Sequence, residues 1–160
     1  MVAISVKELT VITKCKELSD YVFFISEKIP KKYRFSLTNR MQNTSLDIIT
    51  YLYTANDIFV RNETDIKRRE ERIYYQRKAM TCIKLLGYLS HIAYEQNAIL
   101  QKQFEHICKS IYVTTNMLGA WINSELRNIK NMGQKISRKG QQSNAQARPT
   151  RHPPQTYPSC

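Results

Sequence analysis

Side chains able to do acid–base, nucleophilic or metal chemistry are few in this chain, and they are not grouped as a site. The histidines are His91, His106 and His152, and His91 has Glu95 four residues later. On a helix this spacing usually gives a surface pair. The His-Glu-x-x-His motif, the glycine-rich phosphate loop and the Gly-x-Ser-x-Gly elbow are absent from the sequence. We therefore expect a protein that is not an enzyme, with no catalytic residue and no cofactor.

The four cysteines, Cys15, Cys82, Cys108 and Cys160, do not form a metal-binding pattern either. No two of them make a Cys-x-x-Cys motif, and none has a neighbouring histidine at zinc-ligand spacing. The first three lie inside apolar periodic segments. We therefore expect them to be buried free thiols in a reducing compartment. No apolar run approaches the roughly 18 residues of a membrane span. The sequence thus predicts a cytoplasmic protein with no metal site and no membrane partner.

Positive charge is the most informative chemical property of the chain. Its 160 residues include 25 Lys+Arg against 13 Asp+Glu, a net charge of +12. Two groups of cations, with tyrosines interleaved, are candidates for nucleic-acid contact. The first group is Lys31, Lys32, Arg34 and Arg40, and the second is Lys67, Arg68, Arg69, Arg72, Arg77 and Lys78.

In the second group, helical spacing would align Arg68, Arg69 and Arg72 as a basic ridge, because they are three and four residues apart. The alternative is an ordinary solvated face, in which glutamates four residues from arginines simply support the helix. The sequence leaves both interpretations open.

The end of the chain differs in composition from the rest. No acidic residue follows Glu125, whereas residues 126–160 contain seven Lys and Arg and four of the five prolines. The stretch from Gly140 to Pro149 has no apolar face, so it cannot offset the entropy of ordering it. We expect two parts, a bundle over residues 1–130 and a disordered, basic, Pro/Gln-rich tail over residues 134–160. The tail either contacts nucleic acid electrostatically or only aids solubility.

Four apolar series with steps of three and four residues precede this tail. They span residues 11–29, 37–59, 73–94 and 104–129. Such one-sided stripes are typical of bundle helices, and the short links between them favour antiparallel neighbours. The sequence therefore predicts an all-α fold, an up-down-up-down bundle of four helices of about 24 residues each. Gly119 lies within the last series, and we expect it to permit close approach of a neighbouring helix.

Two stretches of this sequence resemble a known family. Ile29-Pro-Lys-Lys-Tyr-Arg-Phe-Ser-Leu37, followed by Leu46 to Asn56, resembles the start of the second helix in the Avd family. Avd is the accessory variability determinant of diversity-generating retroelements. Met117-Leu-Gly-Ala-Trp121 resembles the Gly-Gly-Trp-like motif that closes that family's domain, with Ala120 in place of the second glycine. The resemblance covers about residues 5–125 and excludes the tail.

The resemblance implies a four-helix bundle that assembles into a basic homopentamer. It also implies two kinds of partner, a reverse transcriptase and its template RNA, with cDNA or DNA as a further nucleic acid. Such a protein supports error-prone cDNA synthesis without catalysing it, and Lys31, Lys32 and Arg34 match basic positions of the family motif. Tyrosines expected at outer positions independently favour a homo-oligomer, namely Tyr51, Tyr53, Tyr88 and Tyr112.

Two alternatives stay open. One is a helical protein–protein scaffold that binds no nucleic acid and uses its charge for solubility. The other is the four-helix protein encoded in rRNA intervening sequences. That group typically carries an Asn-Ile-Ala-Glu-Gly segment, which is absent from this sequence.

Overall fold

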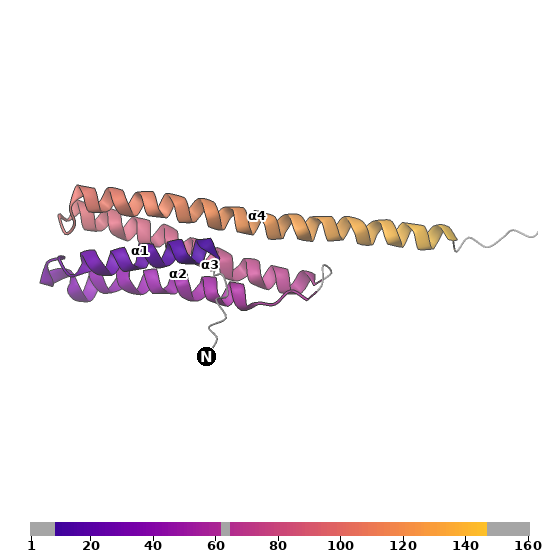
Figure 1. Ribbon diagram of the computed structural model, residues 1–160, viewed down its shortest axis with the longest axis horizontal. Coiled ribbons are helices and arrows are strands. Elements are labelled where there is room, and N and C mark those ends of the chain that lie inside the picture. The colour runs from indigo at the N-terminus through magenta and orange to yellow at the C-terminus, as the bar shows by residue number, and fades with distance from the viewer. Residues whose placement is uncertain (1–8, 62–64, 147–160) are drawn as a thin grey trace, which may run out of the picture.

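Helices account for nearly all of the described chain, which comprises residues 9–61 and 65–146 of the computed structural model (Figure 1). A 3-10 turn and a π-helical turn precede the second helix. The elements are α1 (Thr10–Ser26), η1 (Lys31–Tyr33), η2 (Arg34–Thr38), α2 (Asn39–Asp57), α3 (Ile66–Glu95) and α4 (Gln101–Gln146). These described residues contain no strand, so the predicted all-α class is confirmed.

The helices pack as a bundle. α1 packs against α2 and α4, and α3 packs against the same two helices. In Figure 1 the α2–α3 linker lies at the end of the bundle opposite to the other two linkers. Every helix contributes apolar side chains to one shared core, among them Ile12, Met41, Ile83 and Leu118, all of them fully buried. None of the helices in the described ranges combines the length and the apolar character that crossing a membrane requires.

The first linker shows how the local sequence ends a helix. α1 stops at Ser26, before the expected end at Ile29. Pro30 has no N–H to donate to the Ser26 carbonyl four residues earlier, and it restricts the conformation of Ile29. Its ψ of 138° directs the chain into η1. The turn from α1 to α2 therefore carries Lys31, Lys32 and Arg34 of the first basic cluster, and Arg40 follows in the first turn of α2.

The helix lengths differ from the uniform value expected from the sequence. They are 17, 19, 30 and 46 residues for α1 to α4. The largest difference is in α4, which continues to Gln146, whereas the sequence predicted that a tail begins at residue 134. Extending an existing helix needs no new nucleus, and no proline occurs before Pro149 to stop it. The rest of the predicted tail, residues 147–160, lies outside the described residues.

The end of α4 projects beyond the other helices, as the yellow part of the ribbon in Figure 1 shows. Over residues 133–146 this corresponds to about 20 Å of single helix. Gly119, by contrast, lies where α4 is packed, but no atom within the described chain comes within 4 Å of a Cβ placed there. The expected close approach of a neighbouring helix at Gly119 is therefore wrong within the chain.

Candidate nucleic-acid interface

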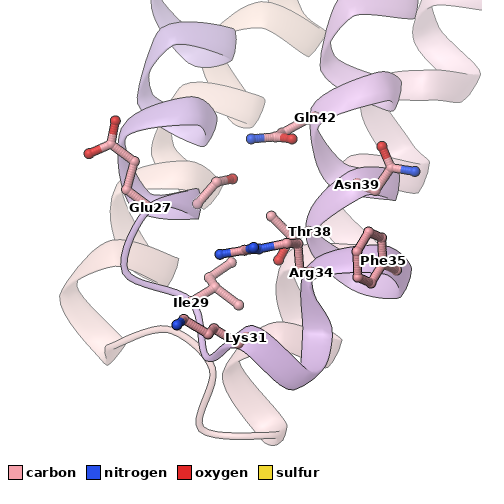
Figure 2. A pocket seen from close by; sticks show the side chains of 9 residues that line it. Glu27, Ile29, Lys31, Arg34, Phe35, Thr38, Asn39 and Gln42 are labelled. Carbon is pink, nitrogen blue, oxygen red and sulfur yellow. The ribbon is translucent and has the colours of Figure 1, made fainter.

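The first basic cluster lies at one end of the bundle, beside a cavity. This bundle-end cavity has a volume of about 520 Å³ and is lined by Lys31 and Arg34, among others. It lies between the C-terminal end of α1 and the turn that leads into α2 (Figure 2). In this view the guanidinium of Arg34 points toward the end of α1 and the Lys31 amine lies nearby. The turn forced by Pro30 thus brings two cations to one concave site.

The cations at this end are accessible and have no counter-ion in the described part of the chain. Lys31, Lys32 and Arg34 are exposed, and none of them forms an ion pair with a carboxylate of the described chain. The Lys32 ammonium lies 4.7 Å from the centroid of the Tyr33 ring. Glu27 lines the same cavity, but Figure 2 shows its carboxylate turned away from Arg34 and Lys31. Positive charge at this end is therefore free to attract an anion.

Arg40 and Lys78 belong to different sequence clusters, but the fold brings them near the same thiol. Burial is the main reason that the pKa of Cys82 is raised, and Asp47 adds to the rise. Arg40 on α2 and Lys78 on α3 oppose it, because both cations favour the thiolate. The α2–α3 face therefore carries cations from both predicted clusters.

Lys78 also lies at the centre of a group of tyrosines, Tyr51, Tyr74 and Tyr75, which we call the tyrosine cluster. Its ammonium is 5.4, 4.7 and 6.0 Å from the three ring centroids, in that order. A hydrogen bond with Tyr74 is the main cause that raises the pKa of Lys78, so the amine stays charged. Tyr51 and Tyr75 are stacked at 6.5 Å, and Tyr74 meets Tyr75 edge-on at 5.3 Å. The bases of single-stranded nucleic acids stack on aromatic faces, and nearby cations attract the phosphate backbone. The tyrosine cluster with Lys78 offers both kinds of group.

The start of α3 separates the second cluster into two kinds of cation. Asp65 caps the helix by accepting a hydrogen bond from the Arg68 backbone N–H at 3.4 Å. Lys67 and Arg68 then point to solvent, as Arg77 does three turns later. None of these three cations is paired with a carboxylate in the described residues.

Arg69 and Arg72 are instead bound within the protein. Arg69 Nη1 donates to one carboxylate oxygen of Glu125 at 2.6 Å, and Arg72 Nη1 donates to the other at 2.8 Å. Arg72 also donates through Nη2 to the backbone carbonyl of Ile58. The side chains of Arg69, Arg72 and Glu125 are only 14, 17 and 6% exposed. The expected basic ridge of Arg68, Arg69 and Arg72 is therefore split, since only Arg68 faces outward.

Sequence reasoning missed the role of Glu125. It is the last acidic residue of the chain, and this position was the only signal that it differs from other glutamates. Its partners lie 56 and 53 residues away, a separation at which no helical spacing rule applies. Beyond it, α4 carries cations that are exposed on the described part of the helix, namely Arg127, Lys130, Lys135 and Arg138.

Groups that could support catalysis or bind a metal are scattered in the part of the chain that the structure describes. No three His, Cys, Asp or Glu side chains there gather at a distance suited to one ion. His91 lies 3.8 Å from Glu95 on the surface, as the sequence predicted. His106 packs against the Tyr21 ring with centroids 4.0 Å apart. The described surface instead carries cations, which can bind anions, and aromatic rings, which can stack on bases.

The fold and these surfaces define a basic helical bundle. No protein-family model matches the chain, and no curated protein matches it either. A proposal of function therefore depends on the residues themselves.

Proposed function

We propose that this protein is a non-catalytic, RNA-binding accessory subunit of a diversity-generating retroelement, as its resemblance to the Avd family implies. In this role it holds template RNA near a reverse transcriptase during mutagenic cDNA synthesis. Its partners are the reverse transcriptase, the template RNA with its cDNA, and further copies of the same chain in a homopentamer.

The observation that carries the RNA-binding part is the accessibility of the predicted cations. Of the ten, seven are exposed and have no carboxylate partner among the described residues: Lys31, Lys32, Arg34, Arg40, Lys67, Arg68 and Arg77. An RNA that neutralises such cations with its phosphates releases condensed counter-ions, so binding is favoured at low salt. The projecting, acid-free end of α4 adds cations on a helix that stands away from the bundle.

Exposed apolar rings support assembly with other proteins. Tyr88 on α3 and Tyr112 on α4 are 63 and 69% exposed, and Phe24 on α1 is 54% exposed. Large exposed apolar side chains are common where subunits meet. The same observation favours the second candidate function, a helical scaffold that binds only protein.

A salt titration of RNA binding tests the proposal. Affinity for a single-stranded RNA should fall with log salt by about 0.7 per phosphate contact. A variant with Lys31→Gln, Lys32→Gln and Arg34→Gln should bind more weakly and show a shallower slope. So should a variant with Lys67→Gln and Arg68→Gln. Lys14→Gln is the matched control, because Lys14 is already paired with Glu17 at 2.7 Å.

Co-purification with a reverse transcriptase separates the two candidate functions, provided that the enzyme is encoded beside the gene for this chain. The accessory subunit should retain both the enzyme and its RNA, and the RNA should be lost from the charge variants. A protein that retains the enzyme while all variants and the wild type bind RNA equally poorly would be a scaffold. Light scattering that gives a monomer at high micromolar concentration would contradict the pentamer.

A further inference from the structure

We propose that the bundle-end cavity is a binding site selective for single-stranded RNA. In this site a backbone phosphate lies between Lys31 and Arg34, and a neighbouring base stacks on Phe35. The inference rests on the proposed RNA binding and narrows it from a basic surface to one concave site.

The phosphate position follows from the charges that line the cavity. Lys31 and Arg34 both line it, and the only carboxylate among its lining residues, that of Glu27, is turned away from them (Figure 2). Two cations and one carboxylate give the lining a formal charge of +1, which matches the single negative charge of a phosphodiester. A guanidinium offers paired N–H donors to phosphate oxygens, whereas the Lys31 ammonium acts as a point charge.

Polar groups around the cavity have hydrogen-bonding capacity left over. The Thr38 hydroxyl has no partner among the described residues, although Thr38 is only 7% exposed. The amide oxygen of Asn39 accepts a hydrogen bond from Asn43 at 3.1 Å, which leaves the amide N–H donors of Asn39 for a ligand. Ser26 is the exception, because its hydroxyl donates to the Val22 carbonyl at 2.6 Å. A buried hydroxyl without a partner is costly, and a ligand oxygen or amide would supply one once the turn opens enough for the ligand to reach it.

The base position follows from Phe35. This residue also lines the cavity, yet its side chain is 89% exposed, the highest value among the large apolar residues of the described chain. A phenyl ring held in water contributes almost nothing to the folded core. It can, however, stack on a nucleic-acid base. Because the bases of a duplex are already stacked on one another, such a ring selects single strands.

The experiment measures binding of a 12-nucleotide single-stranded RNA and of a duplex RNA of the same length, by fluorescence anisotropy. Phe35→Ala should weaken single-strand binding about tenfold, the loss of one stacked base. Duplex binding should change less than twofold. Phe59→Ala is the matched control, because Phe59 is also an exposed ring at 70%, but it follows α2 at the opposite end of that helix. It should bind both RNAs as the wild type does.

Thr38→Val provides a second readout. This change removes the unpartnered hydroxyl, so the melting temperature should stay constant or rise while single-strand affinity falls several-fold. A residue with only a structural role would not separate stability from affinity in this way. Circular dichroism should show the same helix content in all variants, since neither side chain holds the bundle together.

The outcomes distinguish the inference from the function on which it rests. If wild-type protein binds RNA and Phe35→Ala binds single strands as the wild type does, the site is overturned while the proposed function stands. Equal losses for Phe35→Ala and Phe59→Ala, or for single strands and duplex, would overturn it as well. If the wild type binds neither RNA at low salt, both the function and the site are overturned.

Discussion

Replacing Glu125 with alanine should destabilise the protein by leaving two half-buried arginines without a counter-ion. Glu125 is 6% exposed and accepts hydrogen bonds from Arg69 at 2.6 Å and Arg72 at 2.8 Å. Removing one partner of a buried pair typically costs about 3–5 kcal/mol. The two arginine side chains keep 14 and 17% of their surface exposed, so we expect the lower value, about 3 kcal/mol. For a chain of this length each kcal/mol lowers the melting temperature by about 2–4 °C, which predicts a fall of about 6–12 °C.

The matched control replaces all three charged residues with apolar ones, as Glu125→Leu, Arg69→Met and Arg72→Met together. Apolar side chains of similar volume often substitute for a buried ion pair at no cost. The triple variant also loses the hydrogen bond from Arg72 to the Ile58 carbonyl, which lowers its free energy of unfolding by about 1 kcal/mol. The triple variant should therefore melt within about 4 °C of the wild type, well above Glu125→Ala. Thermal unfolding followed by circular dichroism measures both.

The same variants test whether Arg69 and Arg72 take part in RNA binding. Because both are bound to Glu125, the triple variant should keep its RNA affinity within about twofold. The Lys67→Gln, Arg68→Gln variant, one turn away, should lose affinity.

A fall of less than 2 °C for Glu125→Ala, or a triple variant as unstable as the single one, would refute the reasoning from uncompensated charge.

Three further predictions concern the core and α4. Gln76 is fully buried and neither amide atom has a partner in the described residues, so Gln76→Met should raise the melting temperature by several degrees in a thermal scan. Gly119→Ala should stabilise by up to about 1 kcal/mol in urea unfolding, since the space beside it is open and alanine favours helix. Burial raises the pKa of Cys15 from 9.0 to about 12, so the unfolded chain loses this proton first and stability should fall as the pH rises between those values. Melting curves of Cys15→Ala over that range should show a shallower fall than those of the wild type.

The helical class of this protein is readable from the sequence because it depends on local pattern. Apolar residues three and four positions apart create a stripe that only a helix can bury, and this holds whatever the neighbours are. The exposure of Lys31, Lys32 and Arg34 follows for a similar reason, since they come directly after the proline that ends α1. The extent of α4 was not readable in this way. Its last turns have no apolar face, but they continue a helix that the bundle has already nucleated.

The tertiary structure alone decides which cations remain available. Arg68 and Arg69 are adjacent in the sequence, yet one faces solvent and the other reaches Glu125 on α4. Arg40 and Lys78 lie far apart in the chain, yet both act on the Cys82 thiol. From the sequence of one helix, the spacing of charged residues predicts only which side chains share a face. Which face meets another helix, and therefore which charges find a partner, is set by the packing of α3 against α2 and α4.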